Sequence, residues 1–294
     1  MPGFTTHIIM GQECAEEMEG ETHLGKLLKE GGGPYACGLQ GPDVYFYHPL
    51  CTAEGTVKNI GGVMHEGGTK AYFDTCLRII GAARDGDQKD TMVKYLAGFI
   101  SHYYTDSICH PYVYSRIGYD ASRPGRQLFG AHGRLEDEID LLYFRRYGHL
   151  PPKEYHPGRM LALSDEERAV LVRFMAESVS LAYGEGTGTI RLTEMKASQC
   201  LVIFHRGIQV RGMRKDCPDP EEKVLNLDHE RWANSWDRSV VSTKSFPELF
   251  AEALEMTLKA LPLLETAAES GSEEDRTALL SLLGSRSYHS GFEV

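Results

Sequence analysis

Apolar residues recur every three to four positions along most of this chain, which is the spacing of helices that bury one face. Serine and glutamate three residues apart, as in Ser164/Glu167 and Ser245/Glu248, also mark two helix starts by the capping-box pattern. Together these patterns predict helices over residues 22–30, 69–83, 88–110, 132–147, 164–183, 189–210, 245–268 and 273–283. We expect Pro111 to end or kink the third helix, because proline cannot donate the helical hydrogen bond.

Four stretches lack this helical periodicity. Residues 1–21 are mixed in polarity, residues 38–49 are rich in turn formers, a glycine-rich loop carries His65, and residues 211–244 are irregular. No stretch alternates apolar and polar residues as a half-buried strand would. The pattern therefore predicts an all-α fold, formed by a single domain over residues 1–294.

The composition is that of an ordinary globular protein, with 25% charged and 41% hydrophobic residues. A net charge of −11 repels nucleic-acid backbones and anionic membranes, so we expect no stable complex with nucleic acid. Seven scattered cysteines without a Cys-x-x-Cys pair favour reduced thiols, and no apolar run has the length of a signal peptide or a membrane span. These features predict a cytoplasmic protein without a transmembrane segment.

Spacing excludes several common kinds of site. The chain has no Gly-x-Ser-x-Gly elbow, and His65-Glu66 lacks the second histidine of a metalloprotease motif because position 69 is threonine. The run GEGTGT at 184–189 follows a predicted helix rather than a strand, which favours a plain loop over a phosphate-binding one.

The stretch from Tyr95 to Glu138 carries the strongest chemical signal. His102, Asp106 and His110 are spaced four residues apart, so on a helix they share one face, and apolar neighbours indicate that this face is buried. His132 and Glu136 form a second pair with the same spacing. Pairing with other side chains would explain one such pair, whereas two pairs within one short stretch favour a metal ion that offsets the burial of polar groups.

The candidate metal ligands are five histidines and three carboxylates, more than one tetrahedral ion uses, so the set predicts a multinuclear site. The absence of thiolate suits zinc, with manganese and iron as alternatives. Two adjacent ions in such a site activate a water and hold the oxygens of a phosphoryl group. The eight candidates are His7, Asp43, His65, His102, Asp106, His110, His132 and Glu136.

The order of these residues resembles a known family. GPD at 41–43, the isolated His65, HYYTDSICHP at 102–111 and HGRLE at 132–136 follow one another as in the zinc-dependent phospholipase C family, which is related in fold to the fungal single-strand nucleases. The resemblance covers residues 1–147 and extends only loosely beyond them. It implies an all-α fold in which residues 1–147 bear the ligands and two or three zinc ions cluster between helices. Residues 148–294 would then supply supporting helices and a lid-like segment.

The resemblance also implies roles for individual residues. It gives one zinc to Asp43, His65, His102 and Asp106, a second to His110, His132 and Glu136, and a third to His7 together with Asp106 as a bridging carboxylate. It makes Asp43 the candidate general base for the attacking water. The chain departs from the secreted members of the family in two respects. The secreted members supply an amino-terminal tryptophan to the third zinc. They also have five residues between the positions equivalent to Asp106 and His110, where this chain has three.

We therefore expect a zinc-dependent phosphoric diester hydrolase of the phospholipase C type that uses a metal-activated water. Two alternatives remain open: a structural or interaction protein that binds metal on the same fold, and a nuclease-like phosphoesterase. The acidic composition and the lack of a signal peptide favour a soluble phosphodiester or phosphate ester as substrate at least as much as a phospholipid. The sequence does not indicate the oligomeric state.

The remaining candidates have weaker support. His48 is a candidate to hydrogen-bond a ligand carboxylate, and four arginines are candidates to meet a phosphate, with solvated surface charge as their alternative: Arg116, Arg123, Arg126 and Arg134. Five other histidines are predicted to be surface or structural residues: His23, His149, His156, His205 and His289.

Overall fold

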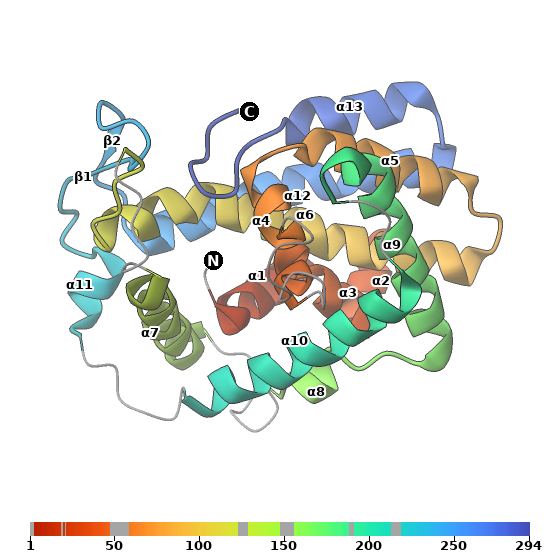
Figure 1. The fold of residues 1–294 in the computed structure, drawn as a ribbon. Helices are drawn as coiled ribbons and strands as arrows, with labels where there is room; N and C mark the ends of the chain where they lie inside the picture. The colour runs from red at the N-terminus through yellow and green to blue at the C-terminus, as the bar shows by residue number, and fades with distance from the viewer. Residues whose placement is uncertain are drawn as a thin grey trace.

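The structure is a computed structural model that describes residues 3–18, 20, 22–47, 59–122, 129–147, 156–187, 191–212 and 219–294. Within these residues the regular structure is almost entirely helical (Figure 1), which confirms the predicted all-α class. The two short strands that the same residues contain, β1 (Trp232–Ala233) and β2 (Val241–Ser242), pair in antiparallel fashion with Trp232 opposite Ser242. The division into a ligand-bearing region and a lid-like region stays a prediction.

The central element is α6 (Gly86–Arg116), whose first turn is capped by the Asp85 side chain, which accepts a hydrogen bond of 3.0 Å from the Gln88 backbone N–H. From Tyr95 to Val113 every residue of α6 is buried. A helix that is buried on all sides must be covered by neighbours on every face. Here α12 (Phe246–Ser270), α3 (Gly33–Gly38) and α9 (Asp165–Thr187) pack against it, and α12 in turn packs against α13 (Glu273–Leu283).

The other helices surround this centre (Figure 1). α1 packs on α7, α5 packs on α9, and α10 packs on α9 and on the 3₁₀ helix η1. Their bounds are α1 (Phe4–Glu17), α2 (His23–Glu30), α3 (Gly33–Gly38), η1 (Gly41–Tyr47), α4 (Ile60–Glu66), α5 (Thr69–Ala82), α7 (Phe129–Tyr147), α8 (Pro157–Met160), α9 (Asp165–Thr187), α10 (Leu192–Gly212) and α11 (Glu221–Leu225). Among the described helices, none is both long enough and apolar enough to cross a membrane.

Two glycines bring α3 unusually close to α6. A Cβ atom on Gly38 would lie 2.0 Å from the Tyr95 carbonyl oxygen, and one on Gly98 would lie 2.4 Å from the Tyr35 carbonyl oxygen. Any side chain at either position would force the two helices apart. Because η1 follows α3 after two residues, this close approach also places η1 against the middle of α6.

Each of the eight predicted helices corresponds to a helix of the structure, with ends that differ by a few residues. Both capping boxes form: the Ser245 hydroxyl accepts from the Glu248 backbone N–H while the Glu248 carboxylate accepts from the Ser245 backbone N–H, and Ser164 and Glu167 do the same. Apolar periodicity and capping boxes therefore predict the helices of this chain correctly.

One helix was missed, and three predictions of local structure are wrong. Residues 4–17 form α1, whose periodicity is hidden because its buried face includes the polar Thr5, Thr6 and His7. His65 lies in α4 rather than in a loop. Residues 184–187 continue α9 rather than starting a loop. Residues 211–244, predicted to be irregular, include the end of α10 as well as α11, β1 and β2.

Pro111 neither ends nor visibly interrupts α6, which continues for five residues beyond it. The proline removes one hydrogen bond that would reach the Ser107 carbonyl. Residues on both sides of it, through Val113, are buried in the core. The burial of those side chains outweighs the missing hydrogen bond, so tertiary packing overrides the local signal.

Candidate metal centre

The eight predicted ligands come from five elements that meet along one face of α6. α6 itself carries His102, Asp106 and His110, which follow one another at helical spacing as the sequence predicts. The other five are His7 from α1, Asp43 from η1, His65 from α4, and His132 and Glu136 from α7. The structure therefore brings all eight predicted residues to one region.

Their donor atoms form three groups, in each of which one atom per residue lies within 4.8 Å of the others. We name them the His7 group (His7, His102, Asp106), the Asp43 group (Asp43, His65, His102) and the Glu136 group (His110, His132, Glu136). The Glu136 group contains the three residues that the family resemblance assigns to one zinc. His102 belongs to both the His7 group and the Asp43 group, so these two groups are continuous.

Asp106 is the central carboxylate of the site. One of its oxygens lies 3.2 Å from His7 Nε2, and the other lies 3.0 Å from His102 Nε2 and 3.7 Å from His65 Nε2. His65 Nε2 also lies 3.5 Å from Asp43 Oδ1. Asp106 therefore faces imidazoles of both the His7 group and the Asp43 group, as a bridging carboxylate would.

Backbone carbonyls fix the orientation of three of the imidazoles. Nδ1 of His65 lies 2.6 Å from the Gly61 carbonyl oxygen, Nδ1 of His102 lies 3.0 Å from the Leu39 carbonyl oxygen, and Nδ1 of His110 lies 2.6 Å from the Tyr288 carbonyl oxygen. A carbonyl only accepts hydrogen bonds, so each Nδ1 is the donor. In the neutral ring the lone pair is then on Nε2, the nitrogen atom that faces the carboxylates.

This arrangement leaves acceptors facing acceptors. Among the described residues, Nε2 of His7, His65 and His102 and both oxygens of Asp106 are buried without a hydrogen-bond partner. A cation between them, whether a proton on an imidazole or a metal ion, would offset the cost of burying acceptors that face each other. Nitrogen and carboxylate donors at this spacing could hold a metal ion.

Protons satisfy only some of these groups. Burial lowers the pKa of His65, but the carboxylates of Asp106 and Asp43 outweigh burial and raise it to about 9, so this ring is charged at neutral pH. Burial, reinforced by repulsion from His102, lowers the pKa of His7 to about 4. Burial also lowers the pKa of His110 to about 4. Of these three imidazoles, only that of His65 is charged at neutral pH.

The pKa of the Asp106 carboxyl is lowered strongly. Burial raises it, but the neighbouring imidazoles of His102 and His110 outweigh burial and hold it well below its usual range. Asp106 is therefore an anion at every pH at which the protein would act, and it is ready to bind metal without losing a proton.

Two local features hold the ligands in place. Gly41 has a φ of +50°, and a Cβ atom there would lie 2.2 Å from the His102 ring, so only glycine allows η1 to bring Asp43 this close. Asp140, on α7, accepts hydrogen bonds from the Thr5 backbone N–H at 2.9 Å and from the Thr6 backbone N–H and hydroxyl at 2.9 and 2.7 Å. This buried carboxylate ties the start of α1 to the helix that carries the Glu136 group.

Asp140 is not among the residues predicted from the sequence, although its signal is present there. It follows Glu136 by four residues, just as Glu136 follows His132, so the three share one face of α7.

His289 was predicted to be a surface or structural histidine, and the structure places its ring beside the candidate ligands. Its ring centroid lies 5.3 Å from that of His65 and 6.0 Å from that of His110. Tyr114 and Trp236 are its other ring neighbours, at 5.5 and 6.4 Å. No local sequence signal links it to the site, because the loop that carries it is remote in the chain.

The remaining candidates lie away from the ligands or outside the described residues. Arg116 contacts Glu230 and the Lys223 carbonyl, and Arg134 donates to the Gly130 carbonyl of its own helix, as solvated charges would. His48, Arg123, Arg126 and His149 lie outside the described residues.

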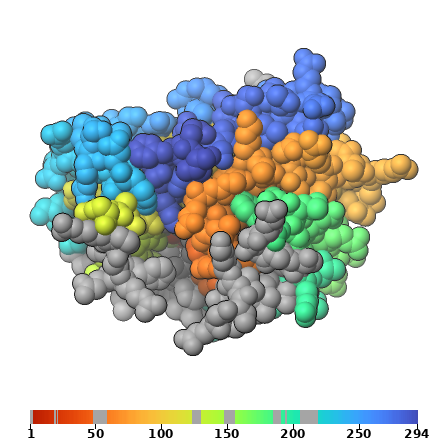
Figure 2. Space-filling model, turned by 45° about the horizontal axis from the view of Figure 1, so that its top comes forward, coloured from red at the N-terminus to blue at the C-terminus, as the bar shows by residue number. Residues whose placement is uncertain are grey.

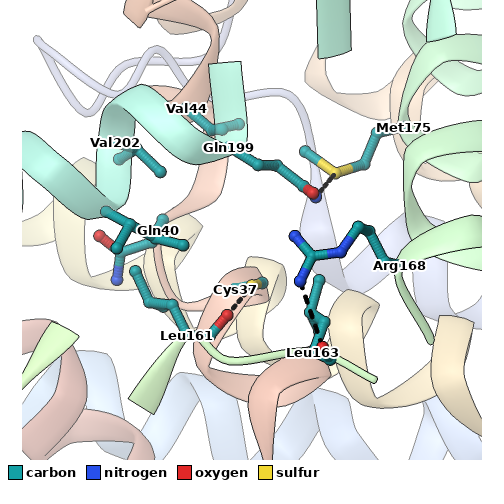
Figure 3. A pocket seen from close by; sticks show the side chains of 10 residues that line it. Cys37, Gln40, Val44, Leu161, Leu163, Arg168, Met175, Gln199 and Val202 are labelled. Carbon is teal, nitrogen blue, oxygen red and sulfur yellow. Dashed lines mark hydrogen bonds between the residues drawn. The ribbon is translucent and has the colours of Figure 1, made fainter. Parts of the chain in front are cut away.

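A separate pocket lies behind η1 (Figure 3), where Gln40 and Val44 form a section of its wall. Its polar contacts are internal: Arg168 donates to the Leu163 carbonyl oxygen at 3.2 Å, and Gln199 Nε2 lies 3.3 Å from Met175 Sδ (Figure 3). None of the eight candidate ligands lines it.

Comparison of the chain with models of known protein families, with curated proteins and with solved structures gave no match. Any assignment of function must accordingly come from the site itself.

Proposed function

We propose that the protein is a metal-dependent phosphodiester hydrolase with zinc as its metal. The observation that carries this proposal is the set of three neighbouring His/carboxylate groups, two of them buried, in which carbonyl-anchored imidazoles turn Nε2 toward carboxylate oxygens. A multinuclear centre of nitrogen and oxygen donors is typical of enzymes that hydrolyse phosphate esters. The order of its ligands resembles that of the phospholipase C family, which supports the same reaction class.

The three groups and Asp43 would have different roles in the reaction. The His7 group and the Asp43 group are closed from solvent, with His7, Asp43, His65, His102 and Asp106 all at most 1% exposed. The side chains of His132 and Glu136 are 16% and 13% exposed, so the Glu136 group is the side from which a substrate arrives. Bound ions would supply polarisation of phosphoryl oxygens and acidification of a water. Asp43 would orient that water and take its proton.

The test combines metal analysis with turnover. Wild-type protein prepared in zinc should carry two or three equivalents per chain and should hydrolyse bis-p-nitrophenyl phosphate, and a chelator should remove both properties. Asp43→Asn keeps an oxygen ligand but not the base, so it should lose most turnover while the protein stays folded. Asp74→Asn, at an exposed salt bridge with Arg78, is the matched control and should change neither. Folded wild-type protein without zinc and without chelator-sensitive turnover would refute the proposal.

The near-complete burial of two of the groups favours a second candidate, a structural metal centre. Closed sites in which protein residues supply every ligand contribute folding energy rather than turnover. In that case chelation should lower the melting temperature while the zinc-loaded protein shows no hydrolysis of any diester, and Asp43→Asn should mainly reduce thermal stability.

The substrate class can be determined by measuring the turnover of a panel of phosphate esters by the zinc-loaded protein. It contains vesicles of choline phospholipid, mononucleotide diesters, a single-stranded oligonucleotide and sugar phosphates. With a net charge of −11, we expect faster turnover of the small soluble diesters than of the vesicles. Strong preference for vesicles would refute that expectation, and preference for the oligonucleotide would favour the nuclease-like alternative.

A further inference from the structure

Residues 285–294 form a compact loop that follows α13, and we call it the 285–294 loop. Its ends are joined by a hydrogen bond of 3.0 Å from the Val294 backbone N–H to the Ser285 carbonyl. Inside it, the Ser287 backbone N–H donates to the Phe292 carbonyl at 2.8 Å, and the Glu293 carboxylate accepts from the Ser285 backbone N–H at 2.7 Å. These bonds give the loop a defined shape of its own.

The 285–294 loop is docked on the metal centre by its backbone. The Tyr288 backbone N–H donates to the His65 carbonyl at 3.0 Å, and the Tyr288 carbonyl accepts from Nδ1 of His110 at 2.6 Å. On its other side, the Asn234 side chain donates to the Ser290 carbonyl at 2.9 Å. In the space-filling view this segment, in dark blue, lies between the orange α4 region and the cyan β1–β2 region (Figure 2).

Gly291 seats the loop on α6 at the site of the proline. A Cβ atom on Gly291 would lie 2.6 Å from the Ser107 carbonyl oxygen and 3.3 Å from Pro111 Cγ. Ser107 is the residue whose carbonyl loses its helical partner to Pro111. Only glycine fits at position 291, so the loop packs closely on α6 there. Ser107, which it contacts, lies between Asp106 and His110 in sequence.

This docking places His289 between two ligand groups. Its ring lies over His65 of the Asp43 group at an interplanar angle of 28°, and its other ligand neighbour is His110 of the Glu136 group. Among the described residues, neither of its ring nitrogens has a hydrogen-bond partner, whereas Nδ1 of His65 and of His110 is bound to a carbonyl. No group of potential ligand atoms in the described chain includes His289.

We infer that His289 is an anion-contact residue, which donates a hydrogen bond to a phosphoryl oxygen bound between the Asp43 group and the Glu136 group. The inference rests on the proposed function, because it takes the anion to be the phosphoryl group of the substrate or product. Within the described chain, the ring of His289 has no hydrogen-bond partner on either nitrogen, and it lies beside His65 of the Asp43 group and His110 of the Glu136 group. A phosphoryl group bound between the Asp43 group and the Glu136 group would therefore have oxygens next to this ring. A donor that is already in place stabilises such an oxygen without reorganisation.

The first experiment measures phosphate binding to zinc-loaded protein by calorimetry, together with zinc content and steady-state kinetics. His289→Ala should keep its zinc, should bind inorganic phosphate about tenfold more weakly or worse, and should lose kcat/KM to a similar extent. His289→Gln keeps an N–H donor and should recover some of both losses. His23→Ala, whose ring pairs with Asp90 on the surface, is the control and should match wild type.

The outcomes separate the inference from the proposed function. Phosphate affinity unchanged in His289→Ala overturns the inference, and so does the loss of one zinc equivalent, because His289 would then be a ligand. Wild-type protein that binds zinc but not phosphate overturns it as well. Wild-type protein that binds zinc and phosphate without hydrolysing any diester refutes the proposed function alone.

The second experiment tests the loop that holds His289. Gly291 and Gly118 have nearly equal positive φ angles, +73° and +71°, so alanine costs the same backbone strain at both. At Gly118 a Cβ atom meets nothing within 4 Å, whereas at Gly291 it meets the Ser107 carbonyl. Gly291→Ala should therefore weaken phosphate binding as His289→Ala does, while Gly118→Ala should not. Equal phosphate affinity in the two glycine variants would contradict the role of the loop.

Discussion

Replacing Asp106 by asparagine should release more than one zinc ion per chain, whereas replacing Glu136 by glutamine should release about one. Asp106 belongs to the His7 group and faces His65 of the Asp43 group at 3.7 Å, while Glu136 belongs to one group. Each amide has nearly the volume of the carboxylate and keeps one of its oxygens, while an NH2 group replaces the other. The main change is therefore the loss of the negative charge.

The size of the effect follows from electrostatics. Two unit charges about 4 Å apart interact by about 4 kcal/mol at an effective dielectric constant of about 20, so a carboxylate and a dication interact by roughly 8 kcal/mol. The Asp106 oxygens lie 3.0 to 3.7 Å from Nε2 of His7, His65 and His102, so ions bound by those nitrogens are within this range. Desolvation cancels much of the attraction. If a quarter remains, about 2 kcal/mol, each affinity falls roughly 30-fold.

The assay is zinc content by mass spectrometry after dialysis against a zinc buffer set about tenfold above the wild-type Kd. Wild-type sites are then about 90% occupied, and sites weakened roughly 30-fold are about one quarter occupied. Circular dichroism verifies that the variants are folded. Asp90→Asn, which removes a surface carboxylate beside His23, is the charge-matched control and should keep all its zinc. Equal zinc losses in Asp106→Asn and Glu136→Gln would refute the bridging role of Asp106.

Four further outcomes are expected. Because the pKa of His65 is raised to about 9 in the metal-free fold, zinc must displace its proton, and apparent zinc affinity measured by chelator competition should rise about tenfold per pH unit from pH 7 to 9. The same shift stabilises the metal-free fold fully below pH 6.5, and urea titrations should show this contribution lost as pH rises through about 9. Asp140→Ala leaves buried donors of Thr5 and Thr6 unpaired, so it should cost about 3 kcal/mol of unfolding free energy and reduce zinc content; full zinc content would contradict the anchoring of α1. Ser245→Ala breaks a capping box that contains no candidate ligand, and it should cost about 1 kcal/mol with zinc content unchanged.

The sequence by itself determined the helices and the ligands that share a helix. The apolar periodicity around α6 and the capping box at Ser245 act over a few residues, so they are readable without knowledge of the fold. The spacing of His102, Asp106 and His110 is of the same kind, because the helix itself brings residues four apart onto one face. α1 was missed for the converse reason: its inward face carries His7 and two threonines for the site, which interrupts the apolar pattern.

Only the tertiary structure decided how the groups are completed and closed. Asp43 reaches His102 because glycines at 38, 41 and 98 allow close approach of backbones, and no periodicity encodes which surfaces will meet. The carbonyl that orients His110 belongs to Tyr288, 178 positions away, and the same loop delivers His289. Contacts at such separation depend on the packing of the whole core, since local free energies of a few tenths of a kcal/mol cannot specify them.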